Sequence, residues 1–212
     1  MGNMITNNGY RYELLGDGKI KVYSYTGGGD VAVPDTLDGY DVAEMSQLTY
    51  TNCGVQRLAL SEKPQKPMII SVCWALEAIA LPDGLDAGLA PRVMTCPIFK
   101  EFEVGEGSEN YALNEGVLFS KDGSILYRMP CACGIGHYVV PDGVREIAPH
   151  AFNGCYNLRS VKLPEGLRKI GFSAFEILKD MAEVVIPRSC EADPDCGLFP
   201  EHDFDDDEDE SY

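Results

Sequence analysis

Apolar residues recur along the chain with a regular period, and within each period a short run alternates between apolar and polar positions. Prolines mark the period, because Pro141, Pro164 and Pro187 are evenly spaced. Alternate side chains of an extended strand point to opposite faces, so we expect a short strand with one buried face before each proline. The positions predicted to point inward are Ile79, Leu81, Phe102, Val104, Val161, Leu163, Val184 and Ile186, and those predicted to point outward include Ala80, Glu103, Lys162 and Val185.

Four of the eight cysteines fall at one position of this repeat. Cys155 follows Pro141 at the same separation in sequence as Cys96 follows Pro82. A free buried cysteine behaves as a small hydrophobe, so recurrence at one phase predicts a column of buried, reduced thiols rather than ligands or nucleophiles. The predicted column consists of Cys53, Cys73, Cys96 and Cys155.

A repeat period in the low twenties, combined with an LxxLxL arrangement of aliphatic residues, is typical of a leucine-rich solenoid. Residues 76–81, 99–104 and 158–163 fit that arrangement, whereas the first copy carries an additional segment at 38–42. Each unit is too small to bury its own apolar face, so stability must come from neighbouring coils. The pattern predicts an α/β leucine-rich repeat solenoid with a parallel sheet of short strands on its concave face.

Residues 140–175 closely resemble the repeat of BspA-type leucine-rich repeat proteins, written IPDGVxxIxxxAFxGCxNLxxVxLPxGLxxIGxxAF. The opening at 25–42 resembles the entry module of that family, and residues 116–130 resemble its GVLFxKDGxxLxxxP hairpin. The resemblance covers roughly residues 10–188. It implies a bacterial, non-enzymatic binding protein of the kind that is commonly exported or displayed on the cell surface.

One leucine-rich repeat domain is expected over residues 1–200, followed by an acidic, disordered tail over 201–212. The tail carries many acidic and no basic side chains, so it repels itself. Inside the domain we expect an N-terminal hairpin cap at 10–30, divergent repeats at 31–110, an inserted hairpin at 111–130, regular repeats at 137–188 and a C-terminal cover at 189–200.

The charge balance excludes one class of partner. The chain has 17 basic and 34 acidic side chains and a net charge of −17. Nucleic-acid binding requires clustered basic side chains that displace counterions from phosphates, so no nucleic-acid partner is expected. No apolar run approaches the roughly 18 residues that cross a bilayer, and residues 1–9 lack the pattern of a signal peptide. A cytoplasmic location is expected if the chain is complete, and an extracellular one if a leader was removed.

The candidates for chemistry are few. Cys131, Cys133 and His137 form the one suggestive cluster, but the two cysteines lack CxxC spacing and no second CxxC follows. A metal or redox protein centred on this cluster is kept as an alternative, whereas the leading interpretation has no catalytic residue, metal or cofactor. Cys190 and Cys196 are compatible with either a small disulfide loop or free thiols.

The outward strand positions carry mixed charges and small side chains, which suits a protein or peptide ligand. The resemblance to the BspA-type family implies an alternative, a cell-surface adhesin fragment that binds a host matrix protein or a glycan. A glycan requires exposed aromatic rings. Tyr111 and Tyr127 are candidates for such rings, whereas Trp74 is expected to pack between coils. The predicted binding residues on the concave face are Lys100, Glu101, Glu103, Arg159 and Lys162.

Overall fold

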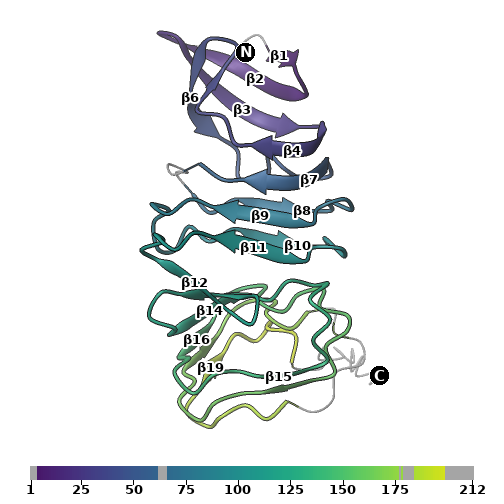
Figure 1. The fold of residues 1–212 in the computed structure, drawn as a ribbon, viewed down its shortest axis with the longest axis vertical. Helices are drawn as coiled ribbons and strands as arrows, with labels where there is room; N and C mark the ends of the chain where they lie inside the picture. Colours follow the sequence, from purple (N-terminus) through teal and green to yellow (C-terminus); the bar gives the residue numbers. More distant parts are fainter. Residues whose placement is uncertain (1–3, 62–65, 177, 179–183, 199–212) are drawn as a thin grey trace, which may run out of the picture.

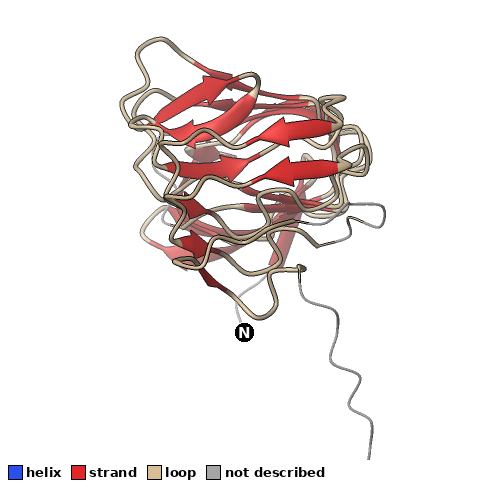
Figure 2. Cartoon of the chain, turned by 90° about the horizontal axis from the view of Figure 1, so that it is seen from below, coloured by secondary structure: helices blue, strands red, loops and turns tan. Residues whose placement is uncertain are grey.

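The computed structural model describes residues 4–61, 66–176, 178 and 184–198. The predicted disordered tail at 201–212 lies outside the described residues. Within them the chain is an elongated stack in which successive coils lie one on another (Figure 1). Seen along the stack, the strands and turns of successive coils superpose around a common interior (Figure 2). The fold is a β-solenoid in which each regular coil takes up one period of the sequence repeat.

One set of parallel strands comes from the segments before the repeat prolines. Their register follows the period, since Glu101 lies opposite Ala78 and His137 lies opposite Ser160, in both cases one period apart in sequence. Four strands form one sheet in the order β11-β9-β7-β4, and two more form a separate pair. These strands are β4 (Gly28–Ala32), β7 (Gly54–Ala59), β9 (Ala78–Leu81), β11 (Glu101–Val104), β15 (His137–Val139) and β17 (Ser160–Lys162).

A second set of strands lies between the repeat prolines and the cysteine column. Two of them pair in parallel, and four belong to a sheet in the order β14-β16-β18-β19. β19 pairs with β18, so regular stacking continues beyond residue 188, where the predicted cover begins. These strands are β8 (Ile69–Ser71), β10 (Arg92–Met94), β14 (Ile125–Arg128), β16 (Glu146–Ile147), β18 (Lys169–Ile170) and β19 (Glu191–Ala192).

The N-terminal end is a mixed sheet, in which β3 pairs with β6 in parallel and the other neighbouring strands are antiparallel. A hairpin lies within the predicted cap at 10–30, and its turn contains Asp17 in the left-handed region at φ 51°. The side chains of Tyr10, Tyr25 and Tyr50 pack beneath it, and the hydroxyls of Tyr10 and Tyr50 are hydrogen-bonded at 2.9 Å. The strands, in sheet order, are β1 (Met4–Asn7), β2 (Tyr10–Gly16), β3 (Lys19–Tyr25), β6 (Tyr40–Met45) and β5 (Thr36–Leu37).

The insertion is more than the single hairpin that we expected. β12 (Tyr111–Asn114), β13 (Val117–Ser120) and β14 form an antiparallel meander, and β14 then joins the coils by pairing with β16 in parallel. Leu118 belongs to the core cluster of the N-terminal half, whereas its neighbours Val117 and Phe119 belong to that of the C-terminal half. Because alternate side chains of a strand face opposite ways, β13 can join the two halves of the core.

The α/β class is wrong, because no helix occurs in the described part of the chain and the fold is all-β. Residues 150–154 show the physical reason. The N–H groups of His150, Phe152 and Gly154 donate to carbonyls of the next coil, at Phe172, Ala174 and Glu176. The N–H groups of the intervening residues close tight turns within their own coil. Since alternate amides bond outside the segment, the i to i−4 bonds of an α-helix cannot form.

The inward alternation is confirmed for most predicted positions. Ile79, Leu81, Phe102, Val161 and Leu163 are buried. The other three, Val104, Val184 and Ile186, pack against the core while partly buried, and the outward Val185 is well exposed.

The four predicted column cysteines are buried, and all eight cysteines are free thiols. Cys53 Sγ lies 3.3 Å from Cys73 Sγ. A fifth member was missed, because Cys131 is buried in the coil before Cys155 and faces it. Cys131 precedes Cys155 by one residue more than the repeat period, so it is out of the repeat register. We call Cys53, Cys73, Cys96, Cys131 and Cys155 the sulfur column.

Candidate functional site

The outward face of the β11-β9-β7-β4 sheet is built from small side chains flanked by charged ones. Ala59, Ala80 and Glu103 are aligned across three adjacent strands. The guanidinium of Arg57 reaches across β9 to Glu103, with Nε donating to Oε1 at 2.7 Å and Nη2 donating to Oε2 at 2.6 Å. The small alanine side chains of β9 leave room for this span between strands that are not neighbours.

The ion pair changes the expected role of Glu103. The hydrogen bonds from Arg57 hold the pKa of the Glu103 carboxyl below its ordinary value. Both side chains remain 40% exposed, and ion pairs of this kind contribute at most about 1 kcal/mol to stability. Glu103 is therefore partly neutralised, and it presents a paired rather than an isolated negative charge to a ligand.

Lys100 is also paired. Its Nζ lies 2.7 Å from an Oε of Glu77, which stands one repeat period earlier in the sequence. Opposite charges at this spacing also meet in the pairs Lys21–Glu44 and Lys169–Glu146. An acidic and a basic residue one repeat period apart therefore predict an ion pair between neighbouring coils. This signal can be read from the sequence alone.

A shallow groove adjoins this face where β9 and β11 end. It has a volume of about 670 Å³, and one wall comes from the insertion through Leu113, whose side chain is 41% exposed. Most of the lining residues are apolar, and Asp83 and Glu103 contribute carboxylates. We call this the β9–β11 groove; its lining residues are Ala80, Leu81, Pro82, Asp83, Phe102, Glu103, Val104, Gly105 and Leu113.

The five predicted binding residues divide between two sheets. Lys100, Glu101 and Glu103 lie together on or beside β11, and Glu103 lines the groove. Arg159 and Lys162 lie beside and on β17, which pairs with β15 in the separate two-stranded sheet. The meander at 111–128 separates the two groups in sequence.

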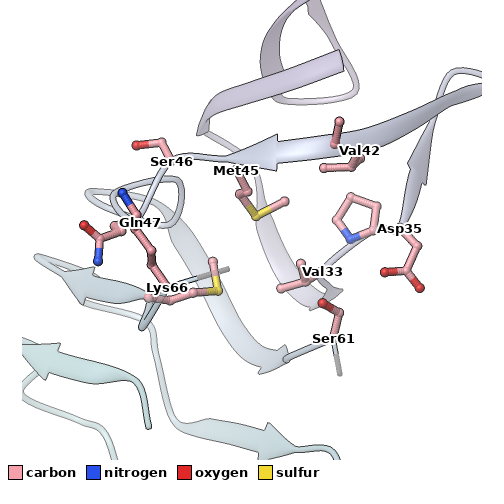
Figure 3. A pocket seen from close by; sticks show the side chains of 11 residues that line it. Val33, Asp35, Val42, Met45, Ser46, Gln47, Ser61 and Lys66 are labelled. Atoms are coloured by element: carbon pink, nitrogen blue, oxygen red, sulfur yellow. The ribbon is translucent and has the colours of Figure 1, made fainter. Parts of the chain in front are cut away.

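A deeper pocket lies near the N-terminal end, where the additional residues 38–42 of the first copy lead into β6. It has a volume of about 370 Å³. Val33, Val42 and Met45 contribute apolar surface, while Asp35 and Lys66 lie on opposite sides (Figure 3). Ligand pockets of a few hundred cubic ångströms with few polar groups are ordinary small-molecule sites, but this pocket has no paired acid and base for proton transfer among its described residues.

The cluster Cys131, Cys133 and His137 is not brought together. Cys131 points into the core, whereas His137 is exposed on β15, and its Nδ1 is 2.9 Å from Ser160 Oγ. The described residues contain no group of three or more His, Cys, Asp or Glu side chains arranged to hold a metal ion. No acidic side chain in the described chain orients His137, so the contact with Ser160 lacks the third group of a nucleophilic triad.

The expectations for Trp74 and Tyr111 are wrong, and Tyr127, the other candidate, is partly buried against the core. Trp74 does not pack between coils, because its side chain is 62% exposed. Tyr111 is buried, and its hydroxyl donates to the Asp86 carbonyl at 2.7 Å, so it cannot serve as a ligand platform. Tyr156, which directly follows Cys155 as Trp74 follows Cys73, is about half exposed. In these two coils, the position after the column cysteine therefore carries an exposed aromatic ring.

Among the described residues, no helix is long and apolar enough to span a membrane. Cys190 and Cys196, for which the sequence allowed a disulfide, are both free thiols.

Comparison with known proteins supports the fold. Residues 128–196 match the family described as BspA type leucine-rich repeat region. The crystal structure of the pneumococcal vaccine antigen PcpA is similar with a TM-score of 0.50 and 17% identity, over 90% of this chain and 71% of that one. A leucine-rich repeat protein from Eubacterium ventriosum is similar with a TM-score of 0.53 and 15% identity, over 90% of this chain and 68% of that one. A search of curated sequences found no match. At these identities, the structural likeness shows the fold alone.

Proposed function

We propose that this chain, a bacterial-type β-solenoid that carries BspA-type leucine-rich repeats at residues 128–196, is a non-enzymatic module that binds a protein or peptide ligand. The observation that carries the proposal is the β9–β11 groove. It combines the exposed side chain of Leu113 and the partly buried Ala80 and Val104 with a flat sheet face, and solenoids generally bind ligands on such extended surfaces.

The chemistry of the groove favours an extended ligand segment with apolar and basic side chains. Apolar side chains would cover Leu113 and Ala80. A basic side chain would meet Asp83 at the groove and Glu101 nearby on β11. An acidic chain with a net charge of −17 also repels polyanions. The proposed ligand is therefore not a nucleic acid. The proposal also involves no insertion into a membrane.

Panning a random peptide display library against the purified chain tests this proposal. We expect Leu113→Arg, which places a bulky cation on the groove wall, to lower the affinity of selected peptides by about tenfold or more, equivalent to about 1.4 kcal/mol. Leu48→Arg is the matched control, because Leu48 is 52% exposed and does not line the groove. Selected peptides that bind both variants as tightly as the wild type would exclude the groove.

A second candidate function rests on Trp74. An exposed indole is a platform on which a sugar ring can stack, as a glycan-binding adhesin would require. Trp74 is the only tryptophan in the chain. If glycans bind there, titration with a glycan panel should change the intrinsic tryptophan fluorescence, and Trp74→Phe should weaken binding measured by calorimetry. If no glycan in the panel changes the fluorescence or gives a binding signal in calorimetry, glycan binding at Trp74 is excluded. The proposal for the β9–β11 groove is unaffected by that result.

A further inference from the structure

Arg128, at the end of β14, is buried in the centre of the stack. Its side chain is only 1% exposed. Nη2 donates to the Asn153 carbonyl at 2.7 Å, and Nη1 donates to the His150 carbonyl, while Nε has no hydrogen-bond partner. The guanidinium thus ties the insertion to the turn of the next coil. Arginine cannot be deprotonated in a protein, so this buried group carries a full positive charge.

A buried charge is costly unless an opposite charge lies beside it. No carboxylate forms an ion pair with Arg128 among the described residues. Besides the two carbonyls, the guanidinium has one further hydrogen-bond partner among the described residues. Nη2 also donates to the Sγ of Cys131, at 2.9 Å. A thiol can supply the missing negative charge only by losing its proton. Electroneutrality therefore favours a thiolate at Cys131.

A second thiol lies next to Cys131, in the following coil. Cys155 Sγ lies 3.5 Å from the Met129 carbonyl, and Cys131 Sγ lies 3.6 Å from the Asn153 carbonyl, so each sulfur reaches the backbone of the other's coil. The backbones are joined by the bond from Met129 N–H to the Ala151 carbonyl at 2.9 Å. The two buried thiols therefore lie in adjacent coils, and a disulfide between them requires their Cα atoms to come within roughly 4.4–6.8 Å.

We propose that Cys131 is a peroxide-reactive thiolate, activated by Arg128, and that Cys155 resolves its oxidised form into a disulfide that joins two coils. In the first step the Cys131 thiolate attacks hydrogen peroxide: an S–O bond forms, the O–O bond breaks, and hydroxide leaves. The sulfur becomes a sulfenic acid as the peroxide is reduced. In the second step the Cys155 sulfur attacks the Cys131 sulfur, the S–S bond replaces the S–O bond, and the Cys155 proton leaves with the hydroxyl as water.

The pKa shifts of the thiols differ in direction between Cys131 and Cys53, which lie in different parts of the sulfur column. A hydrogen bond from Cys155, together with the positive charge of Arg128, lowers the pKa of the Cys131 thiol to about 6, while the same pairing raises the pKa of Cys155. Cys53 and Cys73 are also neighbours in adjacent coils, but the hydrogen bond with Cys73 and burial raise the pKa of Cys53. The thiolate is the reactive form, so Cys53 and Cys73 are an internal control without an arginine.

Treatment of the reduced, folded chain with a slight excess of hydrogen peroxide tests the proposal. Samples are quenched over time, alkylated after unfolding and analysed by peptide mass spectrometry. We expect a Cys131–Cys155 disulfide to form about tenfold faster or more than any product at Cys53 or Cys73, because far more of Cys131 is thiolate near neutral pH. The rate at Cys131 should rise with pH around 6 and then level off. Oxidation of Cys133 or Cys190 before Cys131, or a rate at Cys131 that rises only above about pH 8, would overturn the proposal.

Two variants separate the roles. Cys155→Ser keeps both Arg128 and a hydrogen-bond donor beside Cys131 but cannot form a disulfide, so we expect sulfenic acid to accumulate at Cys131, where dimedone traps it. Arg128→Met should slow oxidation of Cys131 by about tenfold or more and move its pH dependence upward. If Arg128→Met fails to fold, as checked by circular dichroism, the pH profile of the wild type and the trapping in Cys155→Ser decide the matter. Unchanged kinetics in a folded Arg128→Met protein, or no trapped sulfenic acid, would contradict the proposal.

Discussion

Phe152→Ala should lower the free energy of unfolding by about 3–5 kcal/mol, the usual cost of truncating a fully buried phenylalanine. The Phe152 ring is fully buried and stacks on Phe175 of the next coil, with the ring centroids 4.9 Å apart and an angle of 21° between the planes. It also lies 6.2 Å from the Tyr138 ring. Truncation removes contacts between two coils, and in a solenoid the stability of each coil depends on such neighbours. Urea unfolding followed by circular dichroism measures the change.

Phe172→Ala is the matched control. The Phe172 side chain is 47% exposed and forms a T-shaped contact with the His150 ring, at 5.6 Å between centroids. We expect its loss to cost at most about 1 kcal/mol, since partly exposed side chains leave little cavity behind. Similar costs for the two variants would mean that the stacking of Phe152 between coils contributes little, which contradicts the solenoid account of stability.

The regular parts of this fold could be predicted because every coil has to satisfy the same packing requirement. Every strand before a proline must bury one face against the neighbouring coil, so the alternation that predicts Phe102 inward and Val185 outward is enforced by packing. The same logic predicts the burial of Cys155. The error in fold class came from the segments between strands. Their amides, as at His150 and Phe152, bond to the next coil, and a partner in another coil cannot be read from the local sequence.

The candidate site was less predictable, because it depends on departures from the repeat. Leu113 reaches the β9–β11 groove only because the insertion places β12 beside the coils, and no periodic position corresponds to it. The partner of Glu103 is Arg57, two repeat periods away, so the contact skips a whole coil. Sequence periodicity predicts neighbours one coil apart, as for Glu77 and Lys100, but not contacts that cross an intermediate strand.

The membership of Cys131 in the sulfur column could not be predicted, because Cys131 lies one residue away from the repeat register. The repeat register assigns the column position of that coil to Ala132, so the sequence gives Cys131 no place in the column and leaves it in the candidate cluster with Cys133 and His137. Its burial follows instead from the meander, which delivers Arg128 into the core just before it in the sequence. A basic residue at the end of an inserted strand gives no sequence signal of burial, since arginines are rarely buried.

Arg128→Met should lower the free energy of unfolding by about 3–5 kcal/mol, the cost of removing one partner from a buried ion pair. Methionine keeps much of the volume, so cavity formation is a minor part of the loss. What is lost is the set of donors to the carbonyls of Asn153 and His150 and the charge beside Cys131. Arg57→Met is the matched control, because Arg57 forms its ion pair at a partly exposed site, where we expect at most about 1 kcal/mol.

A double-mutant cycle with Cys131→Ala then isolates the charge pair. Cys131→Ala alone leaves the guanidinium of Arg128 buried without a counterion, so each single variant should be strongly destabilised. The double variant should be less destabilised than the two single changes added together, with an interaction energy of about 0.5–3 kcal/mol for residues in direct contact. Additive losses, measured by urea unfolding near neutral pH, would mean that Cys131 is a neutral thiol and that Arg128 is held by the two carbonyls alone.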